Sequence, residues 1–282
     1  MRLVRFGAPG RERPGALDAG GTVRDLSGVI ADVSGATLGP DTLATLRAVD
    51  LSTLPTAPHG VRLGACVTGV GKIVAVGLNY REHATEASLA APTEPVLFMK
   101  ATSAITGPSD GIVIPKNARA VDWEVELGVV IGRRTTYVTR EDALAQVAGY
   151  CVINDVSERE FQLKREGQWS KGKSADSFAP LGPWLVTVDD VPDPQSLKLW
   201  LDVNGHRMQS AITSQMIFGV AELIAYVSQF MTLHPGDVIA TGTPSGVGGA
   251  MKPPRFLAPG DVVELGVEAL GTQRHVVRAF AD

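Results

Sequence analysis

The sequence predicts a β-rich α+β fold, and three observations support that class. Short apolar or alternating runs recur along the chain, and each is bounded by glycine, proline, asparagine or aspartate, as strands usually are. Asn204-Gly205 joins two such runs and is a strong signal for a two-residue hairpin turn. Convincing helical patterns are few: residues 140–150 follow Thr139 as a potential N-cap, and residues 218–233 carry apolar side chains at helical spacing.

The chain is expected to divide into a small N-terminal domain, residues 1–65, and a larger domain, residues 70–282. The first has strand signals at residues 3–7 and 22–29 and a short helical pattern at residues 39–50, before a proline-rich link. The second has most of the strand signals. These runs are residues 71–80, 96–100, 112–115, 125–132, 150–155, 183–188 and 197–205.

Composition limits the classes of protein that the chain can belong to. With 44% apolar and 20% charged residues in 282, it is typical of a folded globular protein. The net charge of −4 and the lack of a basic patch argue against a nucleic-acid partner. No apolar stretch approaches the length of a membrane span, so we expect no membrane partner. Two cysteines, Cys66 and Cys151, give no disulfide framework, and a reducing cytoplasm is the expected location.

An acidic pattern interrupts the apolar run at residues 122–132. Side chains alternate along a strand, so Asp122, Glu124 and Glu126 are expected to share one face. Asp155 ends another apolar run and offers a third carboxylate beside the two glutamates. A ligand set made only of carboxylates selects magnesium, manganese or calcium over zinc or copper. The alternative interpretation is the solvated outer face of an edge strand.

Three further polar groups are candidates for catalysis or binding. If residues 79–90 are helical, His83 and Glu86 share a face, and a carboxylate beside an imidazole is typical of a general base. Lys173 lies in a segment rich in glycine and serine that is expected to be irregular, where it could meet a developing oxyanion. Thr243 and nearby backbone amides could hold a carboxylate. Solvated surface charges and a glycine-rich turn are the alternatives.

Several segments, taken in order, resemble the fumarylacetoacetate hydrolase family from about residue 70 to the end. They include "GLNYREHATE", "EPVLFMK", "DWEVELGVVIG", "INDVSEREFQ", "KGKSADSF" and "HPGDVIATGTPSGVG". The resemblance implies a rolled, mixed β-sheet fold and a divalent-metal site. The residues that match the family's motifs are the metal ligands Glu124, Glu126 and Asp155, the catalytic residues His83, Glu86 and Lys173, and the substrate contacts Gln162, Thr243 and Arg159.

Residues 1–35 and 249–261 further resemble the branch of this family that hydrolyses 2,4-diketo-3-deoxy-L-rhamnonate. We therefore expect a hydrolase, dependent on Mg²⁺ or Mn²⁺, that cleaves the C3–C4 bond of a 2,4-diketo acid. From this substrate the products would be pyruvate and lactate. Polar side chains in residues 156–162 and 206–215 are expected to bind a hydroxylated acyl group.

Other activities could use the same residues. Oxaloacetate decarboxylation or ureidoglycolate cleavage could proceed on the same metal site, and a non-catalytic metal-binding protein is a third alternative. The expected partners are a small 2-oxo acid and further copies of the chain, in a homodimer or a larger homo-oligomer.

Overall fold

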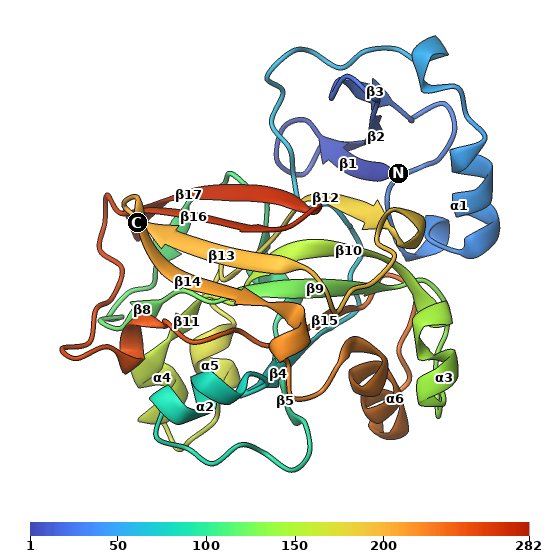
Figure 1. The fold of residues 1–282 in the computed structure, drawn as a ribbon. Coiled ribbons are helices and arrows are strands. Elements are labelled where there is room, and N and C mark those ends of the chain that lie inside the picture. Colours follow the sequence, from blue (N-terminus) through green and yellow to red (C-terminus); the bar gives the residue numbers. More distant parts are fainter. Residues whose placement is uncertain (282) are drawn as a thin grey trace.

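The computed structural model describes residues 1–281 and contains a ten-stranded sheet that is mixed in direction (Figure 1). In sheet order its strands are β3 (Val23–Asp25), β2 (Arg13–Leu17), β1 (Arg2–Phe6), β12 (Ala179–Thr187), β10 (Val147–Asn154), β9 (Val125–Ile131), β15 (Val238–Ala240), β4 (Ile73–Gly77) and β5 (Val96–Lys100), and β6 (Ile105–Thr106) pairs with β12. Strands β15 and β4 are parallel, as are β6 and β12, and the other pairs are antiparallel.

A five-stranded sheet covers part of the first sheet. Its order is β14 (His206–Ile212), β13 (Lys198–Val203), β16 (Val262–Val267), β17 (Gly271–Ala279) and β7 (Ile112–Ile114). Contacts of β13, β16 and β17 with β9, β10 and β12 enclose a continuous apolar core between the two sheets. A third, two-stranded sheet pairs β8 (Val121–Asp122) with β11 (Ser157–Glu158).

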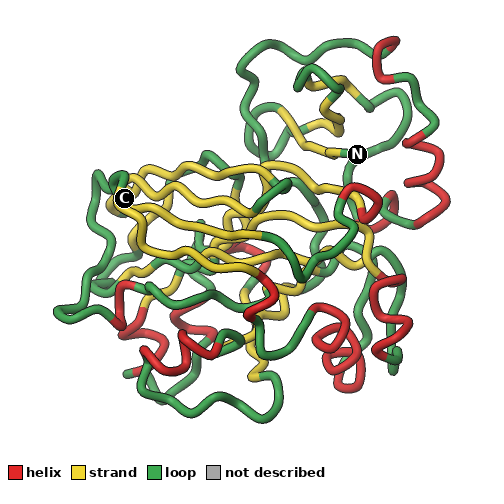
Figure 2. Tube along the Cα trace, viewed as in Figure 1, coloured by secondary structure: helices red, strands yellow, loops and turns green. Residues whose placement is uncertain are grey.

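The helices are short and lie around the strands (Figure 2). The α-helices are α1 (Pro40–Arg47), α2 (Arg81–Glu86), α3 (Arg140–Ala143), α4 (Arg159–Leu163), α5 (Ser170–Lys173) and α6 (Val220–Phe230). The 3₁₀ helices are η1 (Gly35–Thr37), η2 (Leu51–Thr53), η3 (Thr102–Ala104), η4 (Leu144–Gln146), η5 (Val188–Asp190), η6 (Thr213–Gln215) and η7 (Gly248–Ala250). Across residues 1–281, no helix has the length and apolar character that crossing a bilayer requires.

Much of the expected secondary structure is confirmed. Helix α6 lies within residues 218–233, and α1 lies within residues 39–50. Asn204 and Gly205 both have positive φ, 52° and 74°, and form the turn between β13 and β14. Strands β2 and β17 had no strong signal in the sequence.

The prediction of a helix over residues 140–150 is wrong for its second half. Thr139 is the N-cap, because its Oγ1 accepts a hydrogen bond of 3.3 Å from Asp142 N. Helix α3 and the 3₁₀ turn η4 end by Gln146, however, and the chain continues as β10. Pairing with β9 on one side and β12 on the other satisfies the backbone of β10, and this outweighs the local helical pattern.

Two other local predictions require correction. The expected continuous strand at residues 122–132 is interrupted between β8 and β9, where Asn154 Oδ1 accepts from Glu124 N and Gln209 Oε1 accepts from Val125 N. Every residue of β9 is buried, which excludes a solvated edge strand. The segment around Lys173 is not irregular but contains helix α5, and Lys173 is buried.

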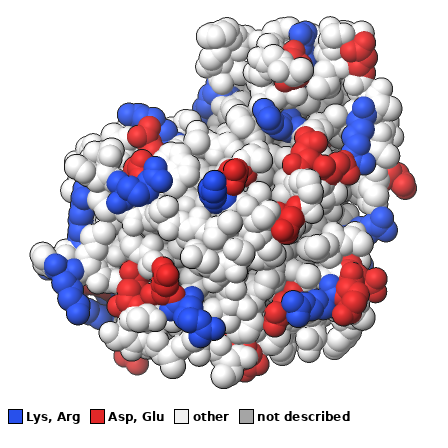
Figure 3. Space-filling model, in the orientation of Figure 1, with Lys and Arg blue, Asp and Glu red and all other residues white. Residues whose placement is uncertain are grey.

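The N-terminal region forms a lobe beside the main body (Figure 1), and its strands continue the ten-stranded sheet because β1 pairs with β12. The domain boundary between residues 65 and 70 stays a prediction. On the face shown in Figure 3, basic and acidic side chains are interspersed, and uncharged surface lies between the charged groups.

Candidate metal and substrate site

Three carboxylates meet where β9 and β10 lie side by side. Glu126 is in β9 opposite Ile153 of β10, Glu124 immediately precedes β9, and Asp155 immediately follows β10. Asp155 N donates to Glu124 O over 2.9 Å, and this hydrogen bond holds the end of β10 beside the start of β9. One oxygen from each of the three acids lies within 4.8 Å of the others, and all three side chains are buried.

Two lysines and an arginine supply positive charge to this cluster. Lys173 Nζ lies 2.7 Å from Glu124 Oε2 and 2.8 Å from Asp155 Oδ2. Lys100, the fully buried last residue of β5, contacts the other oxygen of Asp155. Lys100 was not among the residues predicted for the site, although a lysine that ends an apolar strand is a recognisable signal.

The three acids differ in their electrostatic environment. Burial raises the pKa of Glu124, but the attraction of Lys173 and Arg159 outweighs it and lowers the pKa to about 2. Burial raises the pKa of Glu126 well above its usual value, and repulsion from Asp155 and Glu124 adds to this. Among residues 1–281, Glu126 has no ion pair with a lysine or arginine. A further positive charge here would stabilise its ionised form.

The donor set fits a hard divalent cation. Three buried carboxylates that converge within a few ångströms are the oxygen ligands that Mg²⁺ and Mn²⁺ prefer, and a chelating substrate or water would complete the shell. The raised pKa of Glu126 is the physical sign that the protein alone does not neutralise the cluster.

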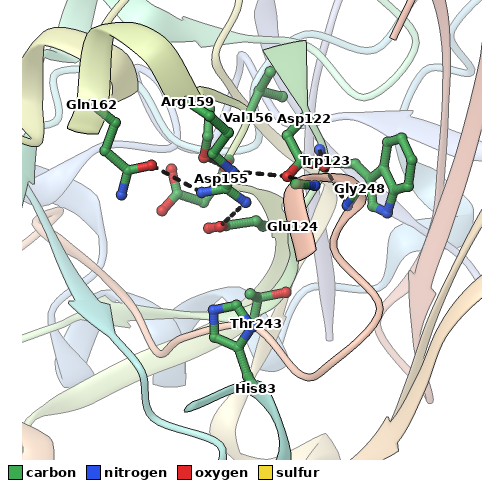
Figure 4. Close-up of polar contacts among 12 residues, drawn as sticks. His83, Asp122, Trp123, Glu124, Asp155, Val156, Arg159, Gln162, Thr243 and Gly248 are labelled. Atoms are coloured by element: carbon green, nitrogen blue, oxygen red, sulfur yellow. Dashed lines mark hydrogen bonds and ion pairs between the residues drawn. The ribbon is translucent and has the colours of Figure 1, made fainter. Parts of the chain in front are cut away.

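Arg159, at the start of α4, holds Glu124 in place (Figure 4). Its Nη2 donates to Glu124 Oε1 over 2.7 Å, its Nε to Asp122 Oδ2 over 2.8 Å, and its Nη1 to Gln162 Oε1 over 3.0 Å. Asp122 also accepts from Gly248 N and Gly249 N. The expectation that Asp122 shares the metal-binding face is therefore wrong: its carboxylate points to Arg159 instead.

His83 and Glu86 form the expected pair on α2. His83 Nδ1 lies 2.8 Å from Glu86 Oε1, and Glu86 Oε2 accepts from Gly246 N over 2.9 Å. If Nδ1–H donates to Glu86, Nε2 of the imidazole is left as an acceptor. In Figure 4 His83 lies below Glu124 and opposite Arg159. The helix itself is shorter than the expected residues 79–90.

A cavity of about 410 Å³ brings these groups together, a size typical of small-molecule sites. His83, Glu124, Glu126, Arg159, Gln162, Lys173 and Thr243 line it. Thr243 Oγ1 is fixed by Val125 O at 3.0 Å and by Gln209 Nε2 at 2.8 Å. Residues 206–215, expected to contact the acyl group, do not line the cavity, and Gln209 is buried behind Thr243.

Comparison with known proteins agrees with the fold. A model of the fumarylacetoacetate (FAA) hydrolase C-terminal domain matches residues 72–278. A protein of Burkholderia multivorans, named provisionally as a hydrolase without a substrate, is 58% identical over 280 residues, and the match covers 99% of each chain.

Solved structures share the fold over nearly the whole chain. Fumarylacetoacetate hydrolase from Exiguobacterium antarcticum is 38% identical, covers 99% of this chain and 100% of its own, and has a TM-score of 0.87. Maleylpyruvate hydrolase from Sphingobium sp. SYK-6, in complex with manganese(II) and pyruvate, is 31% identical at full coverage of both chains, with a TM-score of 0.83.

A 2-hydroxyhepta-2,4-diene-1,7-dioate isomerase from Mycobacterium marinum is 34% identical at full coverage of both chains, with a TM-score of 0.76. Hydrolases and isomerases thus share this fold with mixed sheets. The family model covers most of the chain, and the relatives extend the match over its remainder. This protein therefore belongs to the fumarylacetoacetate hydrolase family.

Proposed function

We propose that this protein is a divalent-metal-dependent hydrolase that cleaves the C3–C4 bond of a 2,4-diketo acid. One observation carries the proposal: a buried three-carboxylate cluster, a lysine bound to two of its acids, and a His–Glu pair all face one cavity. The solved complex of a related maleylpyruvate hydrolase with manganese(II) and pyruvate supports it, because pyruvate is a product of this cleavage.

The metal end of the site would recognise the 2-oxo acid. A cation bound by Glu124, Glu126 and Asp155 would supply Lewis acidity to the 2-oxo and carboxylate oxygens. Lys173 and Arg159 keep Glu124 ionised, and the bond from Arg159 Nη2 orients it for that task. The ammonium of Lys173 lies beside the same acids, where it can stabilise negative charge as it develops on the pyruvate part of the substrate.

His83 would activate water. Glu86 holds the imidazole through Nδ1, so that Nε2 can accept a proton from water as the oxygen attacks the C4 carbonyl. Breaking the C3–C4 bond leaves the bonding electrons on C3 as the enolate of pyruvate. That enolate then takes up a proton, and the acyl half leaves as a carboxylic acid.

The sequence-based candidate for the substrate is 2,4-diketo-3-deoxy-L-rhamnonate, which would give pyruvate and lactate. The test is turnover of this compound beside acetylpyruvate, oxaloacetate and ureidoglycolate with Mg²⁺ or Mn²⁺, followed by identification of the products. We expect pyruvate and a carboxylic acid from 2,4-diketo acids.

Other products would assign another function. Carbon dioxide released from oxaloacetate at a higher catalytic efficiency than any diketo acid shows would make the protein a decarboxylase. Urea released from ureidoglycolate would make it a lyase. Cation binding without turnover of any 2-oxo acid would leave a non-catalytic metal-binding protein.

A further inference from the structure

The cavity has two unlike ends. Its charged groups gather around the carboxylate cluster, whereas most of the remaining wall is made of carbon. We call this apolar part the apolar wall, and its larger side chains are Leu78, Phe98, Leu163, Trp169, Val247 and Phe256. The proposed reaction places the 2-oxo acid at the charged end, so the apolar wall is left for the acyl half of the substrate.

The apolar wall begins directly at the catalytic machinery. Lys173 Nζ lies 4.9 Å from the ring centre of Phe98, and Trp169 packs edge-on against Phe98 with ring centres 5.4 Å apart. The backbone of Gly77 makes room for Trp169, because a Cβ at that position would lie 2.5 Å from the indole Cζ3. The aromatic surface is thus fixed by packing against β4 and β5.

The wall offers little to a second charged group. Arg159 and Lys173 are the basic residues, histidine aside, among the described residues that line the cavity, and both are at the metal end. The guanidinium of Arg159 is already shared among Asp122, Glu124 and Gln162, and the ammonium of Lys173 between Glu124 and Asp155. A terminal carboxylate on the acyl half would lose its hydration without gaining a counter-ion.

Hydroxyl groups on the acyl half would also find few partners. Thr243 Oγ1 is engaged by Val125 O and Gln209 Nε2, and Gln162 Oε1 accepts from Arg159, which leaves the Gln162 Nε2 amide as the donor that these two side chains offer. Both side chains lie at the charged end of the cavity rather than among the aromatic rings. A polyhydroxylated acyl chain would leave buried hydroxyls unpaired, which is costly.

We propose, resting on the function proposed above, that the acyl half of the substrate is uncharged and apolar. The preferred substrate is then an acylpyruvate with an alkyl or aryl group and a single carboxylate. This selects against the sugar-derived diketo acid and against diketo acids that carry a second carboxylate. It also selects against oxaloacetate, which has no group to contact the wall.

The first test measures binding without turnover. The manganese-loaded protein is titrated calorimetrically with 2-oxohexanoate and with 2-oxoadipate, which differ by a terminal carboxylate. We expect at least tenfold tighter binding of 2-oxohexanoate. Equal or tighter binding of 2-oxoadipate overturns the proposal, whether or not the protein hydrolyses any substrate.

The second test measures catalytic efficiency for acetylpyruvate, butyrylpyruvate, maleylpyruvate and 2,4-diketo-3-deoxy-L-rhamnonate. Each buried methylene is worth about a fourfold gain, so butyrylpyruvate, with two more methylenes, should exceed acetylpyruvate by about fifteenfold in catalytic efficiency. A higher catalytic efficiency for the sugar acid or for maleylpyruvate than for butyrylpyruvate overturns the preference for an apolar acyl group. The proposed hydrolase activity would still stand. If the protein hydrolyses none of the four compounds, the proposed hydrolase activity is refuted. The binding of 2-oxohexanoate and 2-oxoadipate still tests whether the wall prefers an apolar group.

A matched pair of variants tests whether the apolar wall causes the preference for 2-oxohexanoate over 2-oxoadipate. Leu163 ends α4 at the cavity mouth and is 58% exposed, so Leu163→Arg adds a cation with little cost to folding. Val29 is 38% exposed and lies outside the cavity, so Val29→Arg is the control. We expect Leu163→Arg to weaken 2-oxohexanoate binding at least tenfold relative to 2-oxoadipate, and Val29→Arg to leave the ratio unchanged. Equal ratios in the two variants would remove Leu163 from the specificity wall and overturn the proposal.

Discussion

At the scale of single residues, Glu126 is the acid that depends most on a cation. Burial, with repulsion from Asp155 and Glu124, raises its folded-state pKa well above the unfolded value of about 4.3. An acid whose pKa is raised on folding contributes its full stability below the unfolded pKa, and this contribution is lost as pH rises through the folded pKa. The contribution of Glu126 to the stability of the metal-free protein should therefore fall as pH rises above about 4.3, and a bound cation should restore it.

Glu126→Gln tests this directly, because the amide keeps the shape and removes the charge. Without metal at pH 8, the variant should unfold at a higher temperature than the wild type. Mn²⁺ should raise the unfolding temperature of the wild type and have little effect on the variant. Glu264→Gln, on the partly exposed strand β16, is the control. If Mn²⁺ stabilises the wild type and Glu126→Gln equally, Glu126 is not a metal ligand.

His83 should be essential for hydrolysis but should not take part in metal binding. His83→Ala should lower the rate of hydrolysis by about two to four orders of magnitude, the usual contribution of a general base. The dissociation constant for Mn²⁺, measured calorimetrically, should remain within about threefold of the wild type. A variant that hydrolyses at the wild-type rate would exclude His83 from water activation.

The sequence could predict which residue types meet in the site but not how each is held. Glu124, Glu126, Asp155, His83 and Lys173 carry local signals, and the structure brings them to one cavity. The contacts of Lys100 with Asp155 and of Arg159 with Asp122 join distant parts of the chain. Such pairings depend on how β5 and α4 pack against β8 and β10. Local sequence patterns carry no information on this packing.

At the scale of elements, the loop of residues 241–249, which runs from β15 into η7, positions two groups at once. Gly246 N donates to Glu86 and so orients His83, while Gly248 N and Gly249 N hold Asp122 and through it Arg159. The loop is therefore the physical link between the base and the metal ligands.

Gly246→Ala should disturb this link. Gly246 has φ +103°, and a Cβ there would lie 2.0 Å from Met208 O, so the backbone must shift and the bond from Gly246 N to Glu86 is disturbed. We expect kcat to fall at least tenfold while Mn²⁺ affinity changes little. Gly260 has a similar φ of +96° with no atom within 4 Å of an added Cβ, so Gly260→Ala controls for backbone strain alone. Equal losses of kcat in both variants would contradict a specific role for the Gly246 contact.

Element boundaries show the same division between local and tertiary information. The cap at Thr139 and the hairpin at Asn204-Gly205 are set by adjacent residues and were predictable. The change from helix to strand at Val147 was not, because neighbouring strands on both sides impose it. Gly149 belongs to that pairing: a Cβ there would lie 2.3 Å from Val186 O of β12.

At the scale of the whole molecule, a charged network joins the N-terminal lobe to the main body. Arg62 contacts Glu12 Oε1 over 2.8 Å and both oxygens of Asp110, which precedes β7. Burial raises the pKa of Asp110, but its bonds with Arg62 and Gly107 N outweigh burial and lower the pKa overall. A depressed carboxyl pKa contributes stability above the unfolded pKa, about 3.9, and loses it as pH falls through the folded pKa.

Asp110→Asn should therefore destabilise the protein in a pH-dependent way. The difference in urea midpoint between wild type and variant should stay constant from pH 8 to about pH 5 and narrow below about pH 4. Asp189→Asn, at a more exposed ion pair, should show a smaller difference throughout. A difference for Asp110→Asn that grows as pH falls would contradict the network's role.

The protein is also expected to associate with copies of itself. We propose a homodimer or larger homo-oligomer, and the side of the molecule formed by α3 and α6 is the expected contact. Tyr137, Leu144 and Phe230 are 76%, 41% and 61% exposed there, and both α3 and η4 contact α6. Light scattering at micromolar concentration should give at least twice the 29.7 kDa chain mass. Phe230→Asp should shift the particle toward the monomer, whereas Val29→Asp in the N-terminal lobe should not. A 29.7 kDa wild-type particle would contradict assembly, and an unchanged oligomer in Phe230→Asp would move the interface elsewhere.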